Sequence, residues 1–256
     1  MFVRMRTIRL VAAWALGLLV YAGCASGFRP QNFGSGEELF AASMERFEKR
    51  KWGDAASGFE RLTFQLGPQD TLLSVSHYYL GLARQRNGEH LLAAQAFSRM
   101  AQSFPRDTLA ERALFRAGSS YSRLWRKPEL DPEYGDAALE TYRLLLSEYP
   151  QSPLADSARM AMSVLREKQA MKDFEVGQDY LRRRFRDSAI LYFRDVVERY
   201  PETDVARRAY LRMLDAYRAI GYDEEAREVC NTLRERNPAD ADVIEACGSA
   251  PPDPAA

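Results

Sequence analysis

Few residues in this chain have the types and spacing that catalysis requires. The 256 residues include two histidines, His77 and His90, which fall in different predicted helices, and no glycine-rich phosphate loop. A metal or catalytic site needs several such side chains clustered together. Acidic pairs such as Glu224 and Glu225 are typical of helix starts, where the helix dipole favours negative charge. The sequence therefore predicts packed or surface histidines, no metal site, no cofactor and no enzyme activity.

Cys24 offers a different chemistry, because it follows a segment with the features of a secretory signal. A basic start is followed by a 12-residue uncharged run from Leu10 to Tyr21. That run is shorter than the roughly 20 residues needed to cross a bilayer as a helix. It fits the apolar region of a signal peptide, which we expect over residues 1–23.

The sequence Tyr21-Ala22-Gly23-Cys24 resembles the lipobox of bacterial lipoproteins. The resemblance implies that the Cys24 thiol takes a diacylglycerol and the freed amine a fatty acyl chain, and two or more chains give stable anchoring. An ordinary signal peptide with an incidental cysteine is the alternative. Ala25 stands where an aspartate would favour inner-membrane retention, so the outer membrane is the expected location.

Composition places the remaining boundaries. Residues 24–36 are rich in glycine and serine and have no sustained period, which predicts a flexible tether after the lipidated cysteine. We expect a repeat domain over residues 37–247 and a disordered tail over residues 248–256.

The two remaining cysteines lie near the end of the chain. Cys230 occupies an apolar position of a helix and is interpreted as a small buried side chain. An oxidising periplasm would also permit a disulfide between Cys230 and Cys247. Their spacing does not decide between the two alternatives.

Charge gives no support for nucleic-acid binding. Without residues 1–23 the chain has 33 basic and 36 acidic residues, a net charge of −3. Such a chain lacks the excess of positive charge that nucleic-acid binding requires. The basic run at Arg182, Arg183, Arg184 and Arg186 is interpreted as a solvated turn.

The chain contains five copies of a helix pair. In the second helix of each copy a small residue precedes a larger one by four positions, so both share one face. The five pairs are Ala55/Phe59, Ala93/Phe97, Ala138/Tyr142, Ala189/Phe193 and Ala226/Cys230. Four copies have a proline eight residues after the larger residue, which ends the helix.

First helices have marks of their own. Gly81, Gly118 and Gly177 are expected where the two helices of a copy approach closely, so that a larger side chain would overpack them. The extra residues 125–132 are predicted to form a loop inside the third copy. One continuous helix is predicted from Pro153 through Arg183 into the fourth copy.

This pattern of small residue, aromatic residue and terminal proline resembles the tetratricopeptide repeat, whose period is about 34 residues. The fold implied is all-α, a right-handed α-solenoid of about five tetratricopeptide-like helix hairpins. Such a solenoid presents a concave surface on which a peptide can lie.

Three phrases make the resemblance more specific. They are Asp131-Pro132-Glu133-Tyr134-Gly135-Asp136-Ala137-Ala138, Tyr149-Pro150-Gln151-Ser152 and Tyr200-Pro201-Glu202-Thr203. With the lipobox and the five repeats, the stretch from Glu37 to Arg236 resembles the BamD family, the lipoprotein subunit of the outer-membrane β-barrel assembly machine.

The resemblance implies a lipid-anchored scaffold on the periplasmic side of the outer membrane, with β-barrel assembly as its function. The implied partners are the POTRA region of the barrel-forming subunit, unfolded outer-membrane proteins and accessory lipoproteins. The family's basic contact for the POTRA region corresponds to Arg207, with Thr203 and Asp204 beside it. The alternative for Arg207 is a solvated residue of a first helical turn. The alternative for the whole chain is another periplasmic repeat lipoprotein, such as a pilus pilotin or a cell-envelope or division adaptor.

Overall fold

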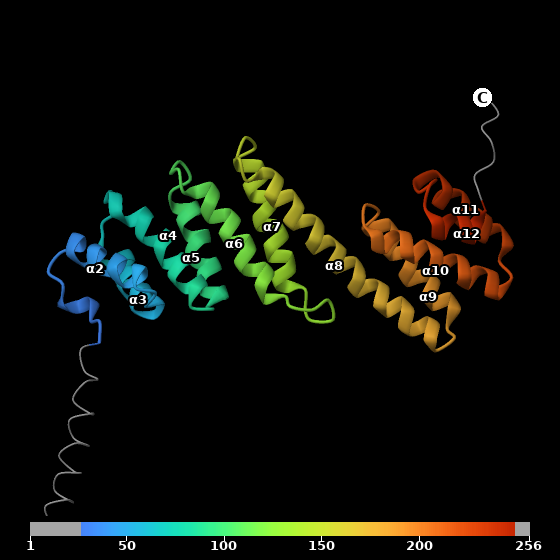
Figure 1. Cartoon of the computed structure of the whole chain (residues 1–256), viewed down its shortest axis with the longest axis horizontal. Helices are drawn as coiled ribbons and strands as arrows, with labels where there is room; N and C mark the ends of the chain where they lie inside the picture. Colours follow the sequence, from blue (N-terminus) through green and yellow to red (C-terminus); the bar gives the residue numbers. More distant parts are fainter. Residues whose placement is uncertain (1–26, 249–256) are drawn as a thin grey trace, which may run out of the picture. The chain divides into compact units, whose positions relative to one another are not determined.

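The computed structural model describes residues 27–248, and all regular structure in that range is helical (Figure 1). After a 3-10 helix, η1 (Pro30–Asn32), come α2 (Gly36–Glu48), α3 (Trp52–Gln65), α4 (Thr71–Arg86), α5 (His90–Ser103), α6 (Ala110–Leu124), α7 (Glu133–Glu148), α8 (Ala155–Arg182), α9 (Arg186–Arg199), α10 (Asp204–Ile220), α11 (Asp223–Arg236) and α12 (Ala241–Cys247). The all-α prediction is confirmed. Within residues 27–248 no helix has the length and apolar character of a membrane span.

The chain divides into two compact units, one up to Ala83 and one from Arg84 onward. The five predicted second helices are α3, α5, α7, α9 and α11, and both marker residues of each are buried. Alanine at the first marker leaves room for the neighbouring helix, and the larger second marker fills the space between helices. The helical-repeat interpretation is therefore confirmed, while the handedness of the solenoid stays a prediction.

In the first unit, residues ahead of α2 fold against the first helix pair. The Phe28 ring packs on Phe33, with their centroids 5.7 Å apart, and the Arg46 guanidinium lies over it at 5.2 Å. Ser35 caps α2 by accepting a hydrogen bond from the Glu38 N–H at 3.2 Å. Residues 27–36 belong to the segment predicted as a tether, and here they make defined contacts through Phe28, Phe33 and the Ser35 cap.

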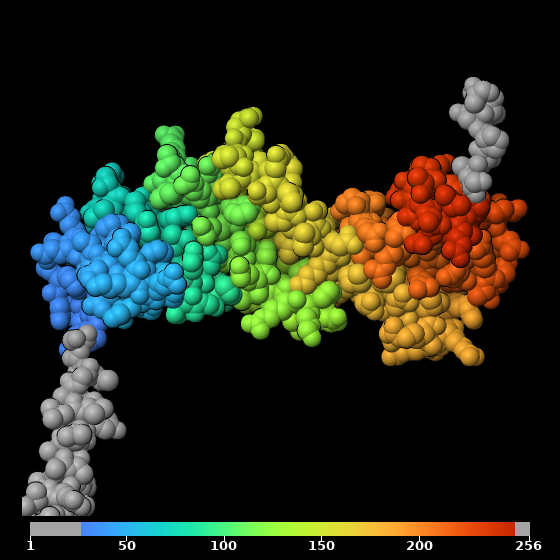
Figure 2. Space-filling view, in the orientation of Figure 1, coloured from blue at the N-terminus to red at the C-terminus, as the bar shows by residue number. Residues whose placement is uncertain are grey.

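In the second unit each helix packs against the next along the chain, from α5 to α12. In space-filling view α9, α10, α11 and α12 form one continuous body, coloured orange to red (Figure 2). The predicted continuous helix is α8, which runs unbroken for 28 residues and ends at Arg182. Its first half packs against α7 and its second half against α9 and α10 (Figure 1).

The predicted loop of the third copy, residues 125–132, is closed over a buried tryptophan. The Trp125 side chain is buried and its Nε1–H donates to the Leu130 carbonyl at 3.3 Å. From α8 the Lys168 ammonium lies 4.5 Å from the Trp125 ring centroid and donates to the Trp125 carbonyl. Gly135 leaves room for this ring, since a Cβ there would lie 2.3 Å from Trp125 Cε3. The loop is thereby fastened to α8.

The glycines singled out in first helices are all buried. A Cβ on Gly118 would lie 2.8 Å from the Tyr142 ring, and one on Gly177 would lie 2.7 Å from the Phe193 ring. Gly118 and Gly177 thus each face the larger marker residue of their own copy. The close approach that the sequence predicts at Gly118 and Gly177 is present in both helix pairs.

Cys230 and Cys247 form a disulfide that joins α11 to α12, with their Cα atoms 5.4 Å apart. Cys230 is also buried, so the two alternatives left open by the sequence are compatible. The predicted signal peptide, Cys24 and residues 249–256 lie outside the described residues.

Candidate functional site: the joint between α9 and α10

The candidate site is the joint between α9 and α10, residues 200–207, which contains all three residues predicted to contact a partner. Pro201 ends α9, and Tyr200 before it has left the helical conformation, with a φ of −130°. Thr203 then caps α10, because its Oγ1 accepts from the Ala206 N–H at 3.1 Å and donates to the Tyr200 carbonyl at 2.7 Å. The joint is a turn held by its own hydrogen bonds.

A side chain from α8 completes the cap of α10. The Glu167 carboxylate accepts hydrogen bonds from the backbone N–H groups of Asp204 and Val205, both at 3.1 Å. These N–H groups belong to the first turn of α10, where no partner exists within the helix and the dipole attracts negative charge. Glu167 therefore fixes the start of α10 against α8.

A polar network around Tyr200 ties the other side of the joint to α8. The buried Tyr200 hydroxyl donates to Asp173 Oδ2 at 3.1 Å, and Arg199 donates to the same oxygen at 3.0 Å. Burial, reinforced by the charge of Asp173, raises the pKa of Tyr200 to about 12. The Arg166 guanidinium covers the ring at 5.1 Å from its centroid. At neutral pH the tyrosine is a neutral donor locked in place.

Arg166 also reaches the outer edge of the joint. Its guanidinium forms an ion pair with Glu202 and donates to the Arg199 carbonyl at 2.5 Å. The hydrogen bond from Arg166 lowers the pKa of Glu202, so this carboxylate stays ionised. Because the Glu202 side chain is 48% exposed, it presents negative charge at the surface while its position is fixed.

Arg207 is held by three aspartates of its own chain. Its Nε donates to Asp204 Oδ1 at 2.9 Å, and its Nη1 donates to Asp242 Oδ2 at 3.1 Å and lies 3.3 Å from Asp240 Oδ2. Burial opposes the charge of the guanidinium, but hydrogen bonds to Asp204 and Asp242 prevail and raise the pKa of Arg207. Only 19% of the side chain is exposed. The guanidinium is thus engaged within the chain.

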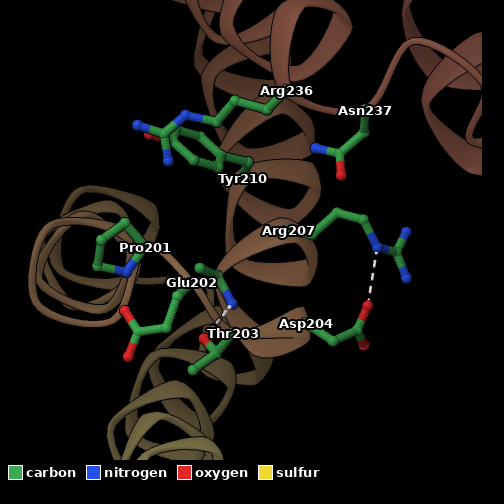
Figure 3. A pocket seen from close by; sticks show the side chains of 9 residues that line it. Pro201, Glu202, Thr203, Asp204, Arg207, Tyr210, Arg236 and Asn237 are labelled. Atoms are coloured by element: carbon green, nitrogen blue, oxygen red, sulfur yellow. Dashed lines mark hydrogen bonds and ion pairs between the residues drawn. The ribbon is translucent and has the colours of Figure 1, made fainter. Parts of the chain in front are cut away.

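A pocket of about 630 Å³ opens beside the joint. It is lined by residues 201–204 together with Ala206, Arg207, Tyr210, Arg236 and Asn237 (Figure 3). On the far side Arg236 lies over the Tyr210 ring at 5.7 Å from its centroid. Charges of both signs surround an aromatic face, which is a surface suited to a peptide carrying charged and apolar side chains.

The structure gives the three predicted residues different exposures. Thr203 is 7% exposed and caps a helix, whereas Asp204 is exposed and Arg207 is largely covered. The other lining residues were not predicted as partner contacts: Pro201, Glu202 and Ala206 lie within the joint, and Tyr210, Arg236 and Asn237 lie outside it. The proline after Asn237 matches the proline of the joint in the repeat pattern, and that parallel is the signal that relates the two segments.

Across residues 27–248 no group of three or more His, Cys, Asp or Glu side chains is arranged to hold a metal ion. Burial, with the charges of Arg123 and Arg126 adding to it, lowers the pKa of His90. His77 is buried in α4.

Curated relatives of this chain share one description, outer membrane protein assembly factor BamD. A curated outer membrane protein assembly factor BamD of Caulobacter vibrioides is 24% identical over 210 residues, which cover 82% of this chain and 68% of that protein. The BamD of Vibrio cholerae is 34% identical over 108 residues, 42% of this chain and 44% of that protein. Among solved structures, the TPR2AB domain of yeast Sti1 aligns over 83% of this chain and 81% of its own, with a TM-score of 0.44 and 16% identity.

The family model described as outer membrane lipoprotein, YfiO, matches residues 34–233. That range covers well over half of the chain and includes the joint between α9 and α10. The predicted membership is confirmed: the chain belongs to the YfiO family of outer membrane lipoproteins, to which its BamD relatives point.

Proposed function

We propose that this chain is a lipid-anchored scaffold for the assembly and insertion of β-barrel outer-membrane proteins. In this proposal it faces the periplasm from the outer membrane and binds the POTRA region of the barrel-forming subunit and segments of unfolded client proteins. The main support for an assembly role is the family match, together with relatives named as outer membrane protein assembly factors. Accessory lipoproteins are further partners in the same assembly.

The joint between α9 and α10 is the proposed contact for the POTRA region. Its backbone is fixed by Thr203 and Glu167, so binding orders little additional structure. Its rim offers Glu202, Asp204 and Arg236 around the Tyr210 ring. Fixed charges favour a partner with complementary charges and reject others.

No turnover is required for this role. A scaffold that holds a client segment near the insertion machinery raises the effective concentration of that segment. The family match and the helical-repeat fold support binding over catalysis, and we propose that the chain acts without chemistry of its own beyond the lipidation of Cys24.

Co-purification tests the proposed partner. The lipidated full chain is recovered from detergent-solubilised membranes, and we expect a POTRA-containing barrel protein among the co-purified proteins. The exposed pair Glu202→Lys and Arg236→Glu should lower that recovery. Arg159→Glu on the exposed face of α8 is the matched control, since Arg159 lies outside the pocket lining and should leave recovery unchanged.

Two results would contradict the proposal. The first is the absence of any POTRA-containing protein from the wild-type preparation. The second is the recovery of pilus or cell-division components in its place, which would favour the alternative of another periplasmic repeat lipoprotein.

The anchor has a separate test. Cys24→Ala removes the thiol that would carry diacylglycerol, so we expect an unlipidated precursor with altered electrophoretic mobility and weakened membrane association. Unchanged mobility and membrane association would show that Cys24 is not the lipidation site.

A further inference from the structure

The last helix, α12, is too short to be stable by itself. It has seven residues, whereas isolated helices below about 12 residues are marginal in water. One of its side chains, Val243, is fully buried, while the adjacent Ile244 is 42% exposed. Its position therefore depends on the groups that fasten its two ends.

The C-terminal end of α12 is fastened to α10 and α11. The disulfide joins Cys247 to Cys230 of α11 across a sequence separation of 17 residues. Two arginines donate to carbonyls of the last turn, Arg218 to Ala246 at 2.9 Å and Arg234 to Gly248 at 3.2 Å. Positive charge at this end also complements the helix dipole.

At the N-terminal end of α12, two acidic side chains contact Arg207. Asp240 caps the helix by accepting from the Val243 N–H at 3.1 Å, and the Asp240 carboxylate also lies within 3.3 Å of Arg207 Nη1. Asp242 accepts from the same Nη1 at 3.1 Å. The carboxylates of Asp242 in α12 and of its N-cap Asp240 thus cover a guanidinium at the edge of the proposed partner pocket.

We infer that α12 is a built-in competitor for Arg207, which an acidic segment of the partner must displace before it can pair with this guanidinium. The inference rests on the proposed function, since it concerns regulation of the same joint. The disulfide keeps Asp240 and Asp242 close to Arg207 and so sets how strongly α12 competes. The partner segment that fits is one with carboxylate side chains, because an arginine fork binds carboxylates bidentately.

Tethering makes this competition effective. An intramolecular group acts at a high effective concentration, which falls when the tether becomes longer and looser. The affinity of a partner is reduced by the fraction of molecules in which the site is closed. Loss of the disulfide frees the end of α12, raises the open fraction and strengthens partner binding.

Arginine-selective labelling tests the closed site without any partner. The purified mature chain is treated with phenylglyoxal, and the modification rate of Arg207 is followed by peptide mass spectrometry. We compare the wild type with Cys247→Ser and with the pair Asp240→Asn and Asp242→Asn. The asparagine pair keeps the disulfide and a good helix cap while removing the competing charge. Arg212, half-exposed on the same helix, is the internal control.

Both variants should label Arg207 at least about fivefold faster than wild type, the lower end of typical coupling between sites. The Arg212 rate should stay the same. Glu245→Gln, which removes an exposed acidic charge from α12 and leaves Asp240 and Asp242 in place, should match the wild type. Equal Arg207 rates in wild type and in the asparagine pair would overturn the inference, whatever the cysteine variant does.

Partner binding separates this inference from the proposed function. The same variants are titrated with the purified POTRA region of the barrel protein. A rise in affinity of at least about fivefold in the asparagine pair supports the inference that α12 competes with the partner for Arg207. Equal binding by all variants contradicts that inference and leaves the scaffold proposal unaffected. If no variant binds the POTRA region while labelling still rises, the proposed partner is wrong and the closure of Arg207 by α12 is right.

Discussion

The side chains permitted at a helix crossing depend on how closely the two backbones approach. Gly177 faces Phe193, which is fully buried and therefore has nowhere to move. Glycine within a helix normally costs stability relative to alanine. At this crossing the loss is offset by the room that glycine leaves for the aromatic ring.

Gly177→Ala should therefore destabilise the protein by about 1–3 kcal/mol, the usual cost of overpacking. Gly53→Ala is the control, because a Cβ there meets no atom within 4 Å and should be neutral or stabilising by up to about 1 kcal/mol. Denaturant unfolding of the two variants measures the difference. Equal stability of both variants would contradict a packing requirement at Gly177.

Tyr200 makes stability depend on pH in the alkaline range. Its pKa rises from near 10 to about 12 on folding, so the folded state holds the proton more tightly. The stabilisation is fully present below pH 10 and is lost as pH rises toward 12, because the unfolded chain ionises first. Tyr200→Phe should be less stable by about 1 kcal/mol at pH 8, since the hydrogen bond to Asp173 is lost. The difference in unfolding free energy between wild type and variant should be smaller at pH 11. Denaturant unfolding at pH 8 and pH 11 measures it, and an equal difference at both pH values would contradict the prediction.

At the scale of elements, the start of α10 depends on a residue of another helix. Glu167 of α8 accepts from two N–H groups in the first turn of α10. This contact joins elements that are separated in sequence by the whole of α9. The cap therefore fixes the geometry of the joint as well as the end of one helix.

Glu167→Ala should cost about 0.5–2 kcal/mol, the usual range for a lost cap. Glu175→Ala, on an exposed position of the same helix, should stay within about 0.5 kcal/mol of wild type. Thermal unfolding compares the two variants. A loss at Glu175 as large as that at Glu167 would mean that helix propensity, and not capping, is responsible.

At the scale of the whole molecule, the second unit is held mainly by contacts between neighbouring helices. A hydrophobic core cluster of this unit runs from Ala170 in α8 to Val243 in α12. In such nearest-neighbour architectures an internal helix is supported on both sides and a terminal helix on one.

Amide hydrogen exchange should therefore be slowest in α9 and α10 and fastest in α12 within this unit. Cys247→Ser should speed exchange in α12 further and leave α9 unchanged, because the disulfide contacts only the end of the unit. Faster exchange spread evenly over α9 to α12 would show that the unit opens as one body.

Much of the local architecture could be predicted from spacing. The small residue four positions before a larger one identified five second helices, and the loop 125–132 and the long helix α8 followed from the interrupted period. Other features carried no local signal. Gly58, where a Cβ would lie 2.0 Å from Ser43 Oγ, marks a close approach of α2 and α3 that only the backbone positions show. Residues 27–36 have the composition of a tether, yet the Phe28 ring packs on Phe33 and lies under the Arg46 guanidinium.

The sequence by itself determined the helices, their order and the family, because apolar spacing, prolines and repeat phrases act over a few residues. Only the tertiary structure decided what Arg207 contacts. Asp240 and Asp242 follow it by 33 and 35 residues, and the fold of α11 back along α10 brings them to its guanidinium. The energy of an ion pair depends on distance in space and on burial, which sequence separation does not specify. Folding thus places α12 over the residue proposed to meet the partner.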